Sequence, residues 1–171
     1  MKNLFLIGMP SSGKTLLGKL LAQRLHYGFV DLDAVIVESE KASIADLFRE
    51  KGEAYFRQVE RQALRQIQPD SSLVLSTGGG TPCFFDNMDF IQGNGLSIFL
   101  EVSTGELLRR MKSSRKNERP LINLEEEERT LLEALDKKYW DRLSFYQRAH
   151  YTIKDDRIGV EMVMEAIGKK S

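Results

Sequence analysis

The chain has 171 residues, of which 42% are hydrophobic and 29% are charged, so its length and balance suit one globular domain with a full core. Its 25 Lys and Arg match its 25 Asp and Glu, and this formal net charge of zero argues against general attraction to nucleic acid or anionic lipid. A single cysteine excludes an intrachain disulfide and suits the cytoplasm, where we expect the protein, and the apolar runs are too short for a signal peptide or a membrane span.

The first part of the chain predicts strand, turn, helix and strand. Residues 4–7 form a continuous apolar run, as in a strand that is buried on both faces of a parallel sheet. After a glycine-rich turn, a helix is indicated by apolar side chains at helical spacing, namely Leu16, Leu17, Leu20, Leu21 and Leu25. Gly28 ends this helical region, and residues 29–31 are predicted to form a second strand.

Helices dominate the middle of the chain. Three helical stretches are predicted after the second strand, near residues 34–40, 43–51 and 53–67. Residues 73–76 form the third predicted strand, and the consecutive glycines at residues 78–80 break the chain just after it. A short helix from about Cys83 then leads to a fourth strand at residues 96–100.

The last third of the chain continues the alternation. A helix begins at residues 106–111 and is interrupted by a polar stretch at residues 112–118. A longer helix follows near residues 125–148, and we expect Trp140 to pack this helix onto the core. A small strand and a further helix are predicted at residues 151–153 and 158–168. Strands that alternate with helices predict an α/β fold with three α/β/α layers around a five-stranded parallel sheet, and ligands of such sheets bind beyond the carboxyl ends of the strands.

The strongest chemical signal follows the first strand. Residues 8–15 read GMPSSGKT and match the phosphate-binding pattern GxxxxGK[ST]. Backbone N–H groups of such a loop surround phosphate oxygens, and the helix N-terminus adds partial positive charge. We expect Lys14 to reach the β- and γ-phosphates of ATP and Thr15 to offer its hydroxyl to Mg²⁺. The alternative is a strand–turn–helix that binds nothing, although this loop lies in the structural context that the motif requires.

Two carboxylates follow the second strand. Asp31 and Asp33 are expected to lie on the same side of this strand, because strand side chains repeat every second residue. Beside Mg-ATP, one carboxylate could support the metal through water while the other orients or deprotonates a hydroxyl. The alternative is that Asp33 caps the next helix and Asp31 is solvated.

Several further motifs are defined by their order along the chain: GExxFRxxE at residues 52–60, STGGG at residues 76–80, RPLI at residues 119–122, and Arg142 shortly before Tyr146. With the phosphate-binding loop and the two aspartates, this ordered set resembles the shikimate kinases. The resemblance runs from about Leu4 to beyond Tyr151, and GExxFRxxE followed by the glycines is its specific part.

The resemblance implies a P-loop kinase fold in one domain over residues 1–171, with a substrate-binding helical region at about 33–62 and a mobile lid at about 112–124. It implies an ATP-dependent kinase that transfers the γ-phosphoryl group to the 3-hydroxyl of shikimate, giving shikimate 3-phosphate and ADP in the pathway to chorismate and the aromatic amino acids. Mg²⁺ is the expected cofactor, ATP and shikimate are the expected partners, and we expect a monomer without nucleic-acid or membrane partners.

Roles of single residues follow from the resemblance. Arg57 and Arg142 resemble the carboxylate-binding arginines, and Glu60 is placed to pair with Arg57. Asp33 resembles the residue that holds the ring hydroxyls and acts as base. The catalytic set is thus Lys14, Asp33 and Arg119, the metal set is Thr15 and Asp31, and the substrate set is Asp33, Arg57, Gly78, Gly79, Gly80 and Arg142. The nucleotide set is Gly8, Ser11, Ser12, Gly13, Lys14, Thr15, Leu16, the adenine-covering Arg110 and the lid arginine Arg119.

Two alternatives and two departures remain. A kinase of the same fold could act on gluconate or a nucleoside monophosphate, although GExxFR and GGG speak against it. A catalytically silent nucleotide-binding domain would not need all of these charged residues. The sequence departs from the family's usual pattern at Ser11, commonly Gly, and at Ser144, usually Pro. His26, His150 and Cys83 are predicted to be structural rather than catalytic.

Overall fold

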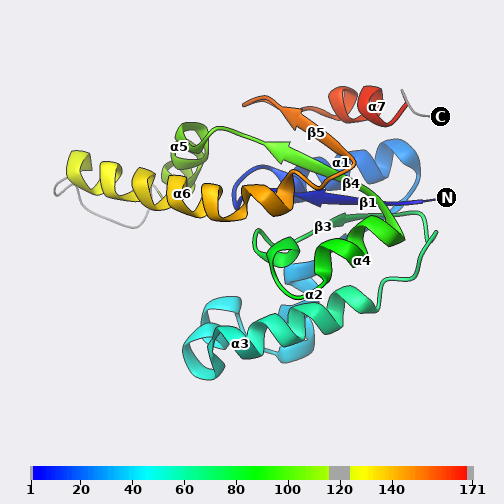
Figure 1. The fold of residues 1–171 in the computed structure, drawn as a ribbon, viewed down its shortest axis with the longest axis horizontal. Helices are drawn as coiled ribbons and strands as arrows, with labels where there is room; N and C mark the ends of the chain where they lie inside the picture. The colour runs from blue at the N-terminus through cyan, green and yellow to red at the C-terminus, as the bar shows by residue number, and fades with distance from the viewer. Residues whose placement is uncertain (1, 116–123, 169–171) are drawn as a thin grey trace.

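The computed structural model describes residues 2–115 and 124–168, and its centre is a sheet of five parallel strands in the order β2-β3-β1-β4-β5 (Figure 1). The strands are β1 (Asn3–Ile7), β2 (Gly28–Asp31), β3 (Leu73–Ser76), β4 (Gly95–Glu101) and β5 (Tyr151–Lys154). The predicted α/β fold with a five-stranded parallel sheet is therefore confirmed.

The central strand β1 separates two apolar clusters. All of its residues are buried, as the continuous apolar run predicted. Leu4 and Leu6 belong to one cluster, whereas Phe5 and Ile7 belong to the other, because successive side chains of a strand point to opposite faces. The register pairs Phe5 with Leu75 of β3 and with Ser97 of β4.

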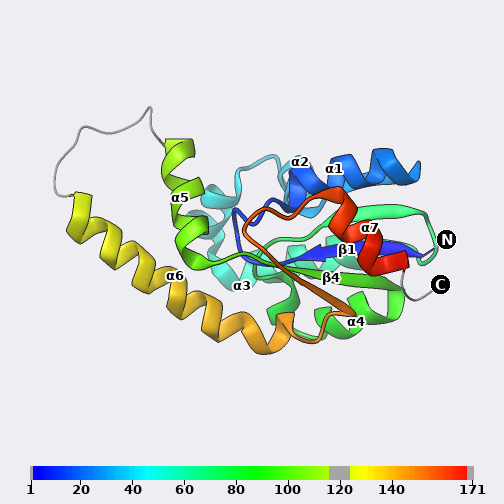
Figure 2. The same cartoon turned by 90° about the horizontal axis from the view of Figure 1, so that it is seen from above.

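Helices cover both faces of the sheet. The helical elements are α1 (Lys14–Leu25), α2 (Leu32–Glu40), α3 (Ile44–Arg65), the 3₁₀ turn η1 (Thr81–Cys83), α4 (Asn87–Asn94), α5 (Thr104–Arg115), α6 (Leu124–Tyr146) and α7 (Val160–Gly168). Figure 1 shows α1 and α7 on one face, and α2, α3 and α4 on the other. The long helix α6 runs out beyond the sheet in both views (Figure 2). No helix in the described ranges is long and apolar enough to cross a membrane.

One glycine divides the helix that carries the GExxFRxxE motif. Two helical stretches were predicted on either side of Gly52, and α3 contains a kink at this residue, with φ 80° and ψ 168°. This backbone conformation is open to glycine and strained for other residues. The segment after the kink carries Phe56, Arg57 and Glu60 inward, and all three side chains are buried.

Two predicted boundaries differ from the structure. The helix expected from about Cys83 is instead a 3₁₀ turn that ends there, and α4 begins only at Asn87, after Asp86. The polar stretch expected to interrupt α5 at residue 112 remains helical as far as Arg115. Residues with high helix propensity, such as Lys and Arg, continue a helix without any apolar periodicity to signal it.

The prediction that Trp140 packs α6 onto the core is wrong. The side chain is 68% exposed, and it contacts Tyr139 edge-on with ring centroids 5.4 Å apart. The inward stripe of α6 is formed instead by side chains at helical spacing: Leu132, Leu135, Tyr139, Leu143 and Tyr146. Trp140 lies off this stripe, so helical periodicity was a better guide than side-chain size.

Candidate active site

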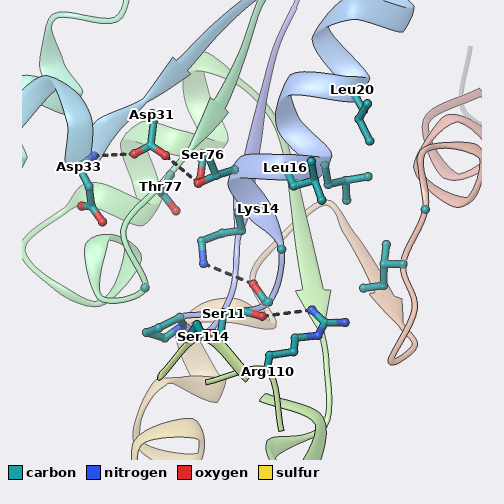
Figure 3. Close-up of a pocket in the computed structure, with 18 of the residues that line it drawn as sticks. Ser11, Lys14, Leu16, Leu20, Asp31, Asp33, Ser76, Thr77, Arg110 and Ser114 are labelled. Carbon is teal, nitrogen blue, oxygen red and sulfur yellow. Dashed lines mark hydrogen bonds between the residues drawn. The ribbon is translucent and has the colours of Figure 1, made fainter. Parts of the chain in front are cut away.

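A cavity of about 690 Å³ lies beyond the carboxyl ends of the central strands, where parallel sheets bind ligands (Figure 3). The residues of the predicted site that line this cavity are Ser11, Ser12, Gly13, Lys14, Thr15, Leu16, Asp31, Asp33, Gly79 and Arg110. The cavity therefore joins the phosphate-binding loop to one edge of the turn formed by the consecutive glycines at residues 78–80, called the glycine turn below. The other predicted residues in the described part of the chain do not line this cavity, namely Gly8, Arg57, Gly78, Gly80 and Arg142.

The loop between β1 and α1 adopts backbone conformations that few residues accept. The φ angles of Gly8, Ser11 and Gly13 are 147°, 66° and 95°. A Cβ on Gly8 would lie 2.8 Å from the Leu100 carbonyl oxygen, so Gly8 shapes the loop beneath the cavity. Helix α1 has no side-chain cap and no acidic residue in its first turn, which leaves its N-terminal partial charge available to an anion.

Lys14 lies buried inside the loop. Its Nζ donates hydrogen bonds to the carbonyl oxygens of Gly8 at 2.9 Å and Met9 at 2.8 Å, and to Ser12 Oγ at 3.3 Å. Burial lowers the Lys14 pKa from 10.5 to about 8, with Asp33 opposing the shift and Arg142 adding to it. The ammonium group is therefore short of compensating negative charge, and phosphate oxygens would supply it.

Asp31 has a structural role that the sequence did not predict. Its Oδ1 accepts hydrogen bonds from the backbone N–H groups of Asp33 and Ala34, so Asp31 is the N-cap of α2. The strand ends at Asp31 and Asp33 lies in the first helical turn, so the prediction of two carboxylates on one side of a strand is wrong. The alternative, a cap by Asp33, is also wrong. The local hydrogen bonds of the Asp31 side chain set the boundary between β2 and α2.

The other oxygen of Asp31 faces the phosphate-binding loop. Thr15 Oγ1 donates to Asp31 Oδ2 at 2.7 Å and lies 3.3 Å from Ser76 Oγ. Within the described ranges, no three His, Cys, Asp or Glu side chains are grouped so as to enclose a metal ion. A hydroxyl and a single carboxylate nevertheless fit Mg²⁺, which keeps several waters and binds substrate phosphates directly.

Asp33 lies at the junction between the loop and the glycine turn. Burial raises its pKa, with further contributions from Asp31 and Glu60, whereas Lys14 and Arg57 lower it. An added Cβ on Gly78 would lie 3.0 Å from Asp33 Oδ1. The carboxylate is thus close to the turn, with its pKa moved in the direction that suits a proton acceptor.

Arg57 is held from several sides. Its Nη1 donates to Glu60 Oε2 at 2.8 Å, so the predicted pairing with Glu60 is confirmed. Its Nε and Nη2 both donate to Glu53 Oε1, at 3.3 Å and 3.2 Å, and the Phe84 ring centroid lies 4.0 Å from its Cζ. Glu53 and Phe84 were not predicted as site residues. The fixed guanidinium can present a defined set of N–H donors to an anion.

The three consecutive glycines, residues 78–80, are required by space, since none of them has a φ in the left-handed region that favours glycine. An added Cβ on Gly80 would lie 2.6 Å from Arg57 Nη2, and one on Gly79 would lie 3.0 Å from Arg142 Nη1. Glu60 Oε1 accepts from Thr81 Oγ1 at 2.6 Å and so ties the turn to Arg57. The turn therefore brings Arg57, which is on α3, and Arg142, which is on α6, against neighbouring residues.

Arg142 has a buried nitrogen without a hydrogen-bond partner among the described residues, which suggests a ligand-binding role. Its Nη1 is buried and makes no hydrogen bond to any described residue. Leaving a buried guanidinium nitrogen unpaired costs free energy, so such a group is expected to have a partner in the working protein. Ser144, where the resemblance led us to expect Pro, does not displace Arg142 from the glycine turn.

The nucleotide end of the cavity contains both predicted and unpredicted residues. Arg110 donates to the carbonyl oxygens of Ser11 at 3.1 Å and Asp156 at 2.6 Å, which fixes it beside the loop. Leu16, which belongs to the predicted nucleotide set, and Leu20, which was not predicted as a site residue, are 69% and 47% exposed and line the cavity, as do residues 158–160. These apolar surfaces suit the face of a nucleobase, and periodicity alone could not have found them.

Two further sequence-based predictions have different outcomes. Cys83 packs against the core, and burial raises its pKa to about 11, as expected of a structural thiol. It is not among the residues that line the cavity. Arg119, predicted to cover the phosphates, lies outside the described residues, as does most of the predicted lid at about 112–124.

Comparison with known proteins gives one family. The family model described as shikimate kinase matches residues 10–170. The chain is 38% identical to the shikimate kinase of Bacteroides thetaiotaomicron over 161 residues, which cover 92% of this chain and 89% of that protein. It is 39% identical to the shikimate kinase of Phocaeicola vulgatus over 161 residues, with the same coverage of 92% and 89%.

Solved structures agree. The crystal structure of the shikimate kinase from Bacteroides thetaiotaomicron superimposes with a TM-score of 0.86 at 35% identity, covering 96% of this chain and 97% of that one. The Acinetobacter baumannii enzyme in complex with shikimate gives a TM-score of 0.84 at 28% identity, covering 99% and 95%.

Proposed function

The chain belongs to the shikimate kinase family, and from this premise we propose how its own residues transfer the γ-phosphoryl group of ATP to the 3-hydroxyl of shikimate. The observation that carries the proposal is the glycine turn, which brings Arg57, Arg142 and Asp33 beside the cavity that Lys14 enters. One end of this site suits phosphates, and the other suits a small acid that bears hydroxyls.

The phosphate-binding loop holds ATP. Lys14 exchanges its loop carbonyls for the β- and γ-phosphate oxygens, and the N-terminal amides of α1 contribute further donors. Thr15 and Asp31 would hold Mg²⁺, Asp31 through water, and the bound ion would supply positive charge to the phosphates. Leu16 and residues 158–160 contact the adenine, while Arg110 flanks it.

The opposite end binds the acceptor. Arg57 and Arg142 bind the carboxylate of shikimate, and the unpaired Nη1 of Arg142 supports this assignment. Gly79 and Gly80 allow backbone N–H groups to approach the ring closely. Asp33 accepts a hydrogen bond from the reacting hydroxyl and aligns it with the γ-phosphorus.

Catalysis in this proposal is mainly positioning and charge stabilisation. Lys14 and Arg119 stabilise the negative charge of the transferring group, and Asp33 takes the hydroxyl proton late, because a loose transition state needs little help from a base. Closure of the proposed lid at about 112–124 excludes water, which would otherwise accept the phosphoryl group.

The cellular setting is part of the same proposal. We place the enzyme in the cytoplasm as a single-domain monomer over residues 1–171, without nucleic-acid or membrane partners. A net charge of zero and the distribution of exposed apolar side chains over several elements support this. Light scattering tests it, and a stable dimer at micromolar concentration would contradict it.

The decisive experiment measures ADP release from Mg-ATP with shikimate, gluconate, AMP and quinate as acceptors. Release should depend strictly on shikimate. Lys14→Ala should abolish turnover, and Arg57→Ala should raise the KM for shikimate more than the KM for ATP. Full turnover by Lys14→Ala would refute the loop assignment, and an unchanged shikimate KM in Arg57→Ala would refute the carboxylate clamp.

A further inference from the structure

We propose that Tyr146 is a positioning residue, whose hydroxyl fixes the peptide between Gly79 and Gly80 so that the Gly80 N–H is aimed at the acceptor. The proposal rests on the function proposed above and adds a residue that no motif assigned. Tyr146 is the last residue of α6, and its side chain is 0% exposed.

Three parts of the site meet at this one side chain. The Tyr146 hydroxyl donates to the Gly79 carbonyl oxygen at 2.5 Å and lies 3.8 Å from the sulfur of Met9, which belongs to the phosphate-binding loop. One helical turn earlier, α6 carries Arg142, which packs against Gly79. Tyr146 therefore connects the phosphate-binding loop, the glycine turn and the helix that carries a carboxylate-binding arginine.

The orientation of one peptide follows from this hydrogen bond. The Gly79 carbonyl and the Gly80 N–H belong to the same peptide unit, and the described chain has no cis peptide bond. In a trans peptide these two groups point in opposite directions. A hydroxyl that holds the Gly79 oxygen on the α6 side therefore turns the Gly80 N–H away from α6.

The hydrogen bonds within the turn do not fix the orientation of the Gly79–Gly80 peptide, whereas the hydrogen bond from Tyr146 does. Within the turn, Thr81 N donates to the Gly78 carbonyl and Cys83 N donates to the Gly80 carbonyl. Neither bond involves the Gly79 carbonyl or the Gly80 N–H. Three consecutive glycines are flexible, since each loses more backbone entropy on ordering than any other residue. An external donor is thus needed to select one orientation of this peptide.

The Tyr146 ring is itself firmly placed, so its hydroxyl is a rigid anchor. The ring packs against Phe99 of the central sheet, with centroids 4.9 Å apart and planes 35° from each other. Burial raises the Tyr146 pKa, with the Arg142 guanidinium opposing the shift, so the hydroxyl remains a protonated donor at working pH.

Tyr146→Phe tests the proposal because it keeps the ring and removes only the hydroxyl. We expect the KM for shikimate to rise about five- to tenfold, the loss associated with one hydrogen bond, while the KM for ATP changes less than about twofold. Tyr139→Phe is the matched control, since Tyr139 lies on the same helix and its hydroxyl donates to Glu101, away from the turn.

A second measurement does not depend on activity. Amide hydrogen exchange should accelerate about tenfold or more at residues 78–81 in Tyr146→Phe, and remain unchanged there in Tyr139→Phe. An unchanged KM for shikimate, equal increases in both KM values, or unaltered exchange in the turn would each overturn the proposal. If the wild-type protein did not phosphorylate shikimate, the proposed function would fail, whereas the exchange result would still decide whether Tyr146 orders the turn.

Discussion

Thr15 Oγ1 donates a hydrogen bond of 2.7 Å to Asp31 Oδ2, which joins the first turn of α1 to the N-cap of α2. The two oxygens of Asp31 are thereby divided between a structural task and the cavity, because Oδ1 accepts the amides at the start of α2. Thr15 and Asp31, the residues proposed to hold Mg²⁺, therefore already lie side by side. The helix that carries Asp33 begins at the same carboxylate.

Asp31→Asn should separate these two tasks. Asn caps a helix as well as Asp does, so the free energy of unfolding should change by less than about 0.5 kcal/mol. The neutral amide supports a Mg²⁺-bound water less well than the carboxylate does, so the Mg²⁺ concentration at half-maximal rate should rise about tenfold or more. Titration of turnover with Mg²⁺, together with urea unfolding, measures both. An unaltered Mg²⁺ requirement would remove Asp31 from the metal site.

Gly80→Ala should impair acceptor binding without harming ATP binding. Gly80 has φ −92°, which alanine tolerates, but the new Cβ would lie 2.6 Å from Arg57 Nη2 and force the guanidinium aside. We expect the KM for shikimate to rise tenfold or more, because small displacements of a positioning group carry large costs. Steady-state kinetics with each substrate varied in turn measures the change.

Gly93→Ala is the matched control for this substitution. An added Cβ at Gly93 meets nothing within 4 Å, and the residue lies in α4. Alanine should therefore stabilise the helix by about 0.5–1 kcal/mol and leave both KM values unchanged. Equal kinetic effects of the two substitutions would show that the glycine turn does not need its lack of side chains for acceptor binding.

Ser11→Gly should stabilise the protein. Ser11 has φ 66° in the phosphate-binding loop, a conformation that costs a residue with a Cβ about 1–2 kcal/mol. Part of this gain is offset by the greater flexibility of glycine in the unfolded chain, so we expect about 0.5–1 kcal/mol in urea unfolding. Ser113→Gly, in the helical backbone of α5, should destabilise by about 0.5 kcal/mol.

The local parts of the site could be predicted because the same residues that carry the chemistry also set the backbone. Gly52 separates two helical patterns and marks a real kink, and the positive φ of Ser11 stands where the resemblance led us to expect glycine. Glu60 was paired correctly with Arg57 because residues three apart on a helix are neighbours.

The parts that depend on tertiary structure could not be predicted. Leu20 stands at helical spacing with Leu17 and Leu21, which are buried, yet it is 47% exposed and lines the cavity. The contact of Tyr146 with Gly79 joins residues that are 67 positions apart, and no local pattern marks it.

The buried charge of Lys14 should give a pH-dependent stability. Its folded pKa of about 8 lies below the ordinary 10.5, so the unfolded state binds more protons between these values and stability rises with pH there. Below pH 8 the lysine is charged in both states, and the folded protein bears the full cost of its burial. Relative to Lys14→Met, which cannot titrate, the wild-type protein should gain about 2 kcal/mol between pH 7.5 and pH 10. A constant difference in urea unfolding would show that Lys14 is not desolvated.

The same lowered pKa should make ATP binding depend on pH, with the opposite sense. Only the ammonium form attracts phosphate oxygens, so the affinity for ATP should fall as the pH rises above about 8. Bound phosphates supply the negative charge that Lys14 lacks and raise its pKa again, so binding at pH 8.5 to 9 must take up protons from the solvent.

Calorimetry of ADP binding in two buffers of different ionisation enthalpy measures this uptake directly. The wild-type protein should take up a substantial fraction of a proton at pH 9 and almost none at pH 6.5, where Lys14 is already charged. Lys14→Met, if it still binds ADP, should lose the part of the uptake that belongs to this residue, and uptake equal to that of the wild type would assign the proton to another group.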